Sequence, residues 1–184
     1  MQKKNYFISV TEARTLLEKS IETMPAKMIS LKEAGGLLSA EDIISPLDTP
    51  PFHQSAMDGY AIKFSDQKTY KIVGEVQAGS EYKAKLKEGQ AVRIFTGACV
   101  PAGADTVVMQ EKVALNGNEI LIEDDQLTAG ANVRHKGSQS KKGDVVLEKG
   151  TLLTPGAVGF IAGLGIDKVK VIQKPKVSIL ITGM

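Results

Sequence analysis

The sequence is poor in several residue types, and each shortage excludes a class of protein. Its single cysteine, Cys99, excludes an internal disulfide and indicates a reducing compartment. Its charges nearly balance, with 23 Lys+Arg against 21 Asp+Glu, so net charge gives no reason to expect nucleic acid or an anionic membrane as a partner. Tryptophan is absent and aromatic residues make up 5%, whereas 18 glycines and 7 prolines indicate many turns.

The sequence also lacks a long apolar run. The apolar N-terminal stretch is interrupted by Thr11, Glu12 and Arg14, which makes it too short for a signal peptide. The longest uncharged run, 150–166, contains glycines, threonines and a proline, so we expect no membrane span. A chain of 184 residues with 42% hydrophobic and 24% charged residues is therefore expected to be globular and cytoplasmic.

Helical signals lie near the two ends of the sequence. Residues 9–24 show an apolar face and a capping box of Ser9 with Glu12, which predicts a helix. A second capping box, Ser30 with Glu33, predicts a short helical turn within 30–38, and 41–45 has the pattern of a strand. Thr154 and Pro155 predict the start of a glycine-rich helix, with a strand at 168–173.

Between residues 59 and 146 the pattern changes to short strands separated by turns. The clearest is "ALNGNEILI", where Asn116-Gly117 between alternating apolar residues predicts a hairpin with a type I′ turn. Short strands at this spacing favour a small β-barrel or sandwich. The apolar run at 176–182 predicts a buried strand that opens an α/β sheet, and because no partner strands follow, we interpret the chain as a fragment.

Three loops carry the chemically interesting residues. They are 52–61 ("FHQSAMDGYA"), 94–105 ("IFTGACVPAGAD") and 130–144 ("GANVRHKGSQSKKGD"). Each has an ordinary explanation: Asp58 can form an Asx turn, Thr96 can cap a strand, and the basic third loop can be a solvated surface. Together, loops rich in N–H, hydroxyl and cationic donors with one carboxylate suit an oxyanion or phosphate-bearing ligand.

Metal and nucleophile signals are weak by comparison. His53, His135 and Cys99 are too few and too scattered along the sequence for a zinc site, so a structural role or plain exposure is expected for them. No Cys-His or Ser-His spacing indicates a nucleophile, and the glycine-rich stretches lack the Lys-Ser/Thr ending of a phosphate loop.

Four longer segments follow one another along the chain: "PPFHQSAMDGYAI", "VGEVQAGS", "RIFTGACVPAGADTVVMQE" and "GANVRHKGSQSKKGD". Their order and spacing are those of the MoeA family, and the sequence resembles this family over residues 10–183. That family comprises the molybdopterin molybdenumtransferases and the E domain of gephyrin. The resemblance implies insertion of molybdenum from molybdate into adenylylated molybdopterin, with Mg²⁺ as the divalent metal. It also implies a homodimer, with molybdopterin adenylyltransferase and molybdoenzyme-maturation proteins as further partners.

With this resemblance we expect an α+β, β-rich fold of three parts. Residues 1–46 with 147–173 would form an elongated mixed domain, and 47–146 an inserted, barrel-like β domain. Residues 174–184 would begin a pterin-binding domain that is otherwise missing. The family's cleft lies between the second domain of one subunit and the third domain of its partner, so this chain alone is expected to be inactive.

The resemblance also implies roles for individual residues. Asp58 and Thr96 match positions implicated in catalysis, with Asp58 also expected to bind the metal. Ser55, Gly97 and Arg134 are the expected substrate-binding residues.

One departure from the family pattern concerns the loop after Arg134. The usual Gly-Glu-Asp run is replaced by Gly137-Ser138-Gln139, and Gln139 cannot serve as a charged metal ligand. The alternative function is therefore a non-catalytic dimerisation or scaffold module. The residues do not distinguish molybdate from tungstate.

Overall fold

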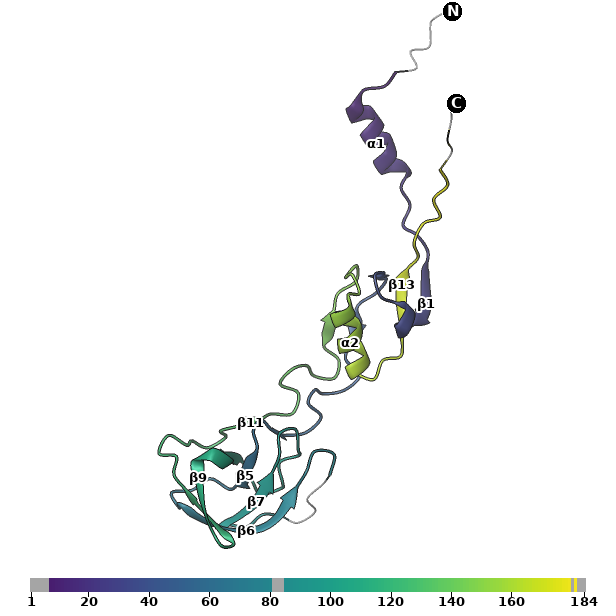
Figure 1. Cartoon of the computed structure of the whole chain (residues 1–184). Helices are drawn as coiled ribbons and strands as arrows, with labels where there is room; N and C mark the ends of the chain where they lie inside the picture. Colours follow the sequence, from purple (N-terminus) through teal and green to yellow (C-terminus); the bar gives the residue numbers. More distant parts are fainter. Residues whose placement is uncertain (1–6, 81–84, 180, 182–184) are drawn as a thin grey trace, which may run out of the picture. The chain divides into compact units, whose positions relative to one another are not determined.

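The computed structural model describes residues 7–80, 85–179 and 181, and the chain divides into two compact units. Unit 1 comprises residues 1–43 and 147–184, and unit 2 comprises residues 44–146 (Figure 1). The chain thus leaves unit 1 once, forms unit 2, and returns.

Unit 1 is built on a three-stranded antiparallel sheet of order β1-β13-β2. β1 (Ala26–Ser30) pairs along its whole length with β13 (Lys168–Ile172), and β2 (Leu38–Ser39) pairs with the other edge of β13. The buried side chains of this unit include those of Val169, Val171, Leu153, Ile161 and Leu164. The alternation of buried valines with exposed lysines along β13 explains why only one face of this strand is apolar.

The two α-helices of unit 1 begin where their capping residues predict. At the start of α1 (Val10–Ser20) the Ser9 hydroxyl accepts from the Glu12 N–H at 3.1 Å, and Glu12 accepts from the Ser9 N–H at 2.9 Å. α1 ends at Ser20, earlier than the predicted limit of residue 24. In α2 (Pro155–Gly163) the Thr154 hydroxyl accepts from the Ala157 N–H at 3.2 Å.

Two other predictions for unit 1 were confirmed only in part or were wrong. The short helical turn predicted within 30–38 is present as a three-residue 3₁₀ helix, η1 (Leu31–Glu33), with Ser30 at its N-cap position, but the predicted hydrogen bond from the Ser30 side chain is not formed. The predicted strand at 176–182 is also not formed in its described residues, where Val177, Ile179 and Ile181 are 78%, 84% and 91% exposed. A strand needs a hydrogen-bonded neighbour, and the described residues provide none for this segment.

Unit 2 contains a six-stranded sheet of order β8-β5-β7-β6-β10-β9. The strands are β5 (Gly59–Ile62), β6 (Thr69–Val76), β7 (Gln90–Ile94), β8 (Thr106–Met109), β9 (Val113–Asn116) and β10 (Glu119–Ile122). A 3₁₀ helix, η2 (Gln110–Lys112), joins β8 to β9. All neighbours are antiparallel except β6 and β7, which are consecutive in sequence and parallel. The β-rich inserted fold is therefore a curled sheet, consistent with the predicted barrel-like class.

The centre of this sheet is buried on both faces. In β5 the side chain of Ala61 belongs to one apolar cluster, whereas those of Tyr60 and Ile62 belong to a second. Because successive side chains of a strand point to opposite faces, the two clusters lie on opposite sides of the sheet. All four residues of β5 are buried as a result.

The predicted hairpin forms, but its turn differs from the prediction. Asn116 pairs with Glu119, so the two-residue loop is Gly117–Asn118 rather than Asn116–Gly117. Gly117 has a φ of 61°, whereas Asn118 does not have a positive φ. A type I′ turn requires positive φ at both central residues, and a glycine at the first position alone is typical of type II′.

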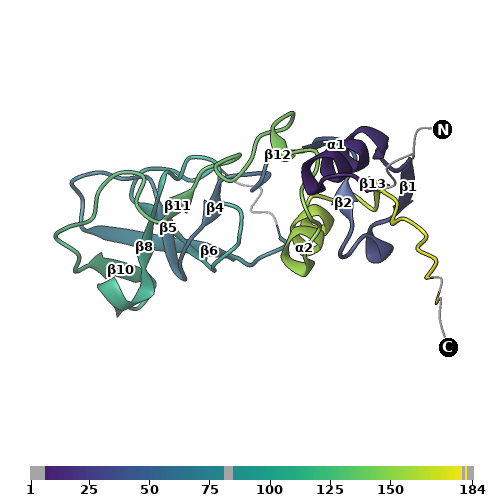
Figure 2. The same ribbon diagram turned by 90° about the horizontal axis from the view of Figure 1, so that it is seen from above.

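Two short ladders complete the pairing. β3 (Ile43–Ile44) pairs with β12 (Val145–Leu147), and β4 (Gln54–Ser55) pairs with β11 (Val133–Arg134), as Figure 2 shows for the second pair. Among the described residues, no helix has both the length and the apolar composition that a membrane crossing requires.

Candidate functional site

Segment 53–55 is hydrogen-bonded along both of its edges, and through these bonds it joins the three loops singled out in the sequence. On one edge the N–H groups of Gly97 and Val100 donate to the carbonyls of Ser55 and His53, each at 2.9 Å. On the other edge, β4 pairs with β11, with Ser55 opposite Val133 and Gln54 opposite Arg134. The three loops therefore lie together in unit 2, although they are far apart in the sequence.

Asp58 is fixed by Thr96. One carboxylate oxygen, Oδ1, accepts from the Thr96 backbone N–H at 2.7 Å and from the Thr96 hydroxyl at 2.8 Å. The other oxygen, Oδ2, accepts no hydrogen bond from the described residues. One oxygen thus positions the carboxylate, and the other is left for a ligand.

The same contacts hold Asp58 in its ionised form. The Thr96 N–H, the Thr96 hydroxyl and the nearby Arg93 guanidinium, in that order of importance, lower the pKa of the Asp58 carboxyl. Hydrogen bonds donated to a carboxylate favour its charged form. Asp58 therefore presents a negative charge at neutral pH.

Sequence reasoning missed three residues that surround Asp58. Arg93 lies over the rings of Tyr60 and Phe95, and its guanidinium donates to the Gln110 side chain at 2.5 Å. Gln110 in turn donates to Glu111, which lowers the pKa of the Glu111 carboxyl, while the charge of Asp58 acts in the opposite direction. These residues belong to β7 and η2, and no local motif in the sequence marks them as neighbours of Asp58.

Ser55 and Gly97 contribute to the framework. Ser55 is fully buried, and its hydroxyl donates to the Met57 carbonyl at 2.6 Å, which closes the turn that leads to Asp58. Gly97 receives a 2.9 Å hydrogen bond from the Gln54 side chain at its carbonyl. In this conformation the Ser55 hydroxyl is directed to the turn and not to the surface.

Arg134 belongs to a basic loop that is organised by one carboxylate. Arg134 is exposed and forms no ion pair with any described residue. Asp48 accepts from the Lys142 N–H at 2.9 Å and lies 3.4 Å from the Lys136 ammonium. These two contacts, led by the Lys142 N–H, lower the pKa of Asp48. Arg134 is opposite Gln54 in the β4–β11 pairing, and an exposed guanidinium on this loop is suited to binding an anion.

The residues of this site fit Mg²⁺ in part. Asp58 Oδ2 and the Glu111 carboxylate are the hard oxygen ligands that Mg²⁺ prefers, and Mg²⁺ commonly binds through one or two carboxylates together with substrate phosphates. The described residues contain no cluster of three or more metal-ligating side chains. Any Mg²⁺ bound here would therefore depend on water and substrate for the rest of its coordination.

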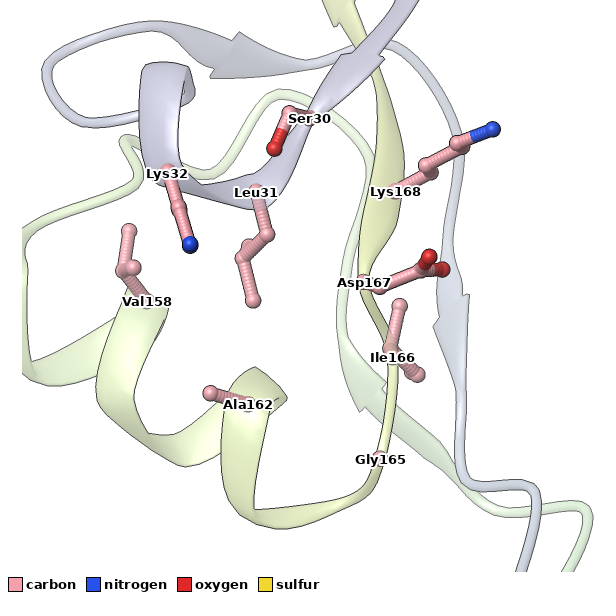
Figure 3. A pocket seen from close by; sticks show the side chains of 9 residues that line it. All are labelled: Ser30, Leu31, Lys32, Val158, Ala162, Gly165, Ile166, Asp167 and Lys168. Atoms are coloured by element: carbon pink, nitrogen blue, oxygen red, sulfur yellow. The ribbon is translucent and has the colours of Figure 1, made fainter.

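A separate hollow lies in unit 1 and has a different character. Its volume is about 570 Å³, and Figure 3 shows Leu31 projecting from η1 towards Val158 and Ala162 of α2. Asp167 and Lys168 line its rim and point away from Leu31 (Figure 3). This mainly apolar hollow contains no set of groups suited to catalysis.

Comparison with known proteins identifies the sequence class. The family model described as MoeA N-terminal region (domain I and II) matches residues 8–165. A molybdopterin molybdenumtransferase from Haemophilus influenzae is 40% identical over 183 residues, which cover 96% of this chain and 45% of that protein. One of the same name from Staphylococcus aureus is 35% identical and is covered to 44%. The chain thus spans a little under half the length of these relatives.

Comparison with solved structures leads to the same family. A molybdopterin biosynthesis MoeA protein from Pyrococcus horikoshii OT3 superposes with a TM-score of 0.83 at 38% identity, over 90% of this chain and 46% of that one. A second structure of this kind gives a TM-score of 0.77 at 33% identity. The mixed α+β, β-rich architecture is therefore shared with these proteins.

Proposed function

The chain belongs to the MoeA family, in the N-terminal region that comprises domains I and II, and on this premise we propose that it forms this region of a molybdopterin molybdenumtransferase. Its substrates would be molybdate and adenylylated molybdopterin. Unit 1 would correspond to domain I and unit 2 to domain II, with the segment from residue 174 leading into the pterin-binding domain.

The observation that carries this proposal is the convergence of three loops on segment 53–55, with Asp58 fixed by Thr96 beside it. Asp58 offers one ionised carboxylate with an open oxygen, and Arg134 offers an exposed guanidinium on the adjoining segment. This combination suits a substrate that carries phosphoryl and oxyanion groups.

The lowered pKa of Asp58 favours one role over another. A general base works best when its pKa lies near the operating pH, and Asp58 lies on the acid side of even an ordinary carboxyl. We therefore assign Asp58 to orienting water or holding the metal, and not to removing a proton. Thr96 positions Asp58, and Arg134 binds the anionic substrate. Gly97 and Ser55 hold the two loops in register.

Mg²⁺, when bound, would neutralise charge on the phosphoryl oxygens of the adenylate, with Asp58 and Glu111 as the residues that hold it. Gln139 stands where the family pattern has an acidic residue, and its backbone N–H donates to the Thr49 carbonyl at 2.9 Å. Glu111 is therefore the second carboxylate that this unit offers to a cation at Asp58.

Homodimerisation is also part of the proposal. α1 has no buried residue, and its apolar side chains, Val10, Leu16 and Leu17, are exposed together with the capping residue Ile21. An amphipathic helix is stabilised mainly by packing its apolar face against another element, and a second copy would supply one. The same observation supports the alternative function, a dimerising scaffold without catalysis. The single Cys99 favours the cytoplasm as the compartment.

A chimera tests the catalytic proposal. This chain would replace the matching N-terminal region of the Haemophilus influenzae relative, and conversion of adenylylated molybdopterin to molybdenum cofactor would be measured. Asp58→Asn removes the charge and should lower the yield by roughly 10- to 100-fold, the usual scale for loss of a group that supports a metal site. The matched control is Asp66→Asn, an exposed aspartate of the same unit, which should leave the yield unchanged.

Two outcomes would contradict parts of the proposal. An unchanged yield with Asp58→Asn would remove Asp58 from the chemistry. A folded, dimeric chimera that forms no cofactor even without substitution would favour the scaffold.

A further inference from the structure

The two histidines of the sequence lie in contact, although 81 residues separate them along the chain. The Nδ1 atoms of His53 and His135 are 3.3 Å apart, and the two rings meet edge to face with centroids 5.3 Å apart. Nothing in the sequence indicates that these two residues are neighbours in space. Sequence distance does not measure spatial distance once β4 and β11 pair.

Strand register explains why the rings meet. Ser55 pairs with Val133 and Gln54 with Arg134, so the next antiparallel positions are His53 and His135. Directly opposite residues in such a ladder have Cβ atoms about 5 Å apart, which places two imidazoles within reach of a common ligand.

The backbone on either side is fixed, so the pair does not depend on a loose loop. The Val100 N–H donates to the His53 carbonyl at 2.9 Å, and the Gly137 N–H donates to the Pro50 carbonyl at 2.9 Å. The Lys136 N–H also approaches His53 Nδ1 at 3.4 Å as a donor. His53 Nδ1 therefore accepts hydrogen bonds from Lys136 and His135. A metal ion would replace these donors, and the His135 ring would carry its proton on Nε2 instead of Nδ1.

We propose that His53 and His135 form a chelating site for a late first-row divalent cation, with Zn²⁺ as the best fit. Two nitrogens bound tetrahedrally at the normal Zn–N distance are roughly 3.3 Å apart, which is the separation of the two Nδ1 atoms. Imidazole nitrogens suit zinc, copper and nickel, whereas Mg²⁺ prefers oxygen. The site therefore differs in chemistry from the carboxylates at Asp58.

The surroundings set the strength of this site. Among the described residues no third histidine, cysteine, aspartate or glutamate completes a metal cluster, so water fills the other positions and the ion can exchange. The positive charge of Lys136 opposes a cation, and its ion pair with Asp48 at 3.4 Å offsets this in part. Both rings are exposed, so the ion has free access.

An ion at this position would connect two of the loops of the candidate site. His53 lies five residues before Asp58, and His135 directly follows Arg134. Bound metal would tie these loops together and stabilise the β4–β11 pairing, because an ion that binds only the folded state raises its stability. The inference rests on the histidine geometry and does not depend on the proposed catalytic function.

The test is a titration of this chain with ZnCl₂, followed by calorimetry and by the ¹⁵N signals of the histidine rings. We expect one ion per chain, and shifts at the Nδ1 atoms of both histidines. His53→Gln and His135→Gln should each weaken binding by at least about tenfold, since the loss even of a supporting residue around a metal costs that much. Cys99→Ser is the matched control, because Cys99 is the single thiol of the sequence, and this variant should bind Zn²⁺ as the parent does.

Competition and stability measurements complete the test. A large excess of Mg²⁺ should not displace Zn²⁺, and Zn²⁺ should raise the Tm of the parent and of Cys99→Ser but not of the double histidine variant. Absence of binding by the parent would overturn the proposal, as would equal affinity in the histidine variants or displacement by Mg²⁺. If a histidine variant does not fold, the ring signals of the parent decide: Zn²⁺-induced shifts confined to other groups overturn the site.

Discussion

Unit 2 buries apolar side chains on both faces of one sheet, whereas unit 1 buries one face of a smaller sheet and leaves the whole of α1 without a buried residue. Unit 2 has the properties of a self-contained folding unit. Unit 1 exposes apolar surface that globular proteins normally cover. The difference indicates that unit 2 derives its stability from its own core, and that α1 gains most of its stability from whatever packs against it.

The sharpest test of this comparison is Gly59→Ala. A Cβ at Gly59 would lie 1.8 Å from the carbonyl oxygen of Val108 and 2.8 Å from its carbon, both backbone atoms of the neighbouring strand β8. We expect unit 2 to lose about 4 kcal/mol or more of unfolding free energy, measured by urea denaturation.

The control in unit 1 is Gly35→Ala, where nothing lies within 4 Å of the added atom. Its effect should stay within about 0.5 kcal/mol. Equal losses in the two variants would mean that the close approach of β5 to β8 is not what limits stability.

The second prediction compares a core residue with a residue of α1. Ile94 is fully buried in unit 2, and Ile94→Ala should cost about 2–5 kcal/mol. Leu17 is 64% exposed, and Leu17→Ala should cost less than about 0.5 kcal/mol in the dilute chain.

Light scattering distinguishes the roles of these two side chains. If α1 packs against a second copy, Leu17→Ala should weaken self-association while leaving unfolding of the dilute chain unchanged. A Leu17→Ala variant as unstable as Ile94→Ala would show that α1 is buried within its own chain.

The smallest predicted effect concerns acid. The pKa of Asp58 is lower in the folded chain than its unfolded value, chiefly through the Thr96 N–H, so its ionised form favours folding. This contribution is present above the ordinary carboxyl pKa of roughly 4 and is lost as the pH falls through the lower folded value. In Asp58→Asn the free energy of unfolding should therefore fall less steeply as the pH is lowered below about 5. Urea denaturation at a series of pH values measures this slope. An unchanged slope would contradict the assignment.

Local signals in the sequence predicted the elements whose causes are local. Ser9 with Glu12, and Thr154 with Pro155, mark the starts of α1 and α2, because a cap satisfies N–H groups only a few residues away. The hairpin at β9 and β10 was predicted for the same reason. Its turn type was not, because the register that placed Gly117 first in the loop is set by pairing along the strands.

Long-range contacts could not be predicted in this way. Nothing near Asp58 in the sequence indicates that its oxygen is bound by Thr96, which lies 38 residues away, or that Glu111 is close to it. The contact between His53 and His135 depends on the pairing of β4 with β11, two strands of two residues each, for which the sequence carries almost no signal. The residues of the candidate site were named from resemblance, and their mutual geometry came from the structure.

Because segment 53–55 is hydrogen-bonded along both of its edges, its length cannot change without disturbing both neighbouring segments. An insertion or deletion of one residue there would turn His53 and Ser55 to the opposite side of the ladder and shift both neighbouring segments out of register at once. By contrast, the Gly117–Asn118 loop lies at the end of the β9–β10 ladder. Residues added there would lengthen the loop and leave the pairing of β9 with β10 in place. Length variation is therefore expected at that hairpin tip and selected against between residues 53 and 55.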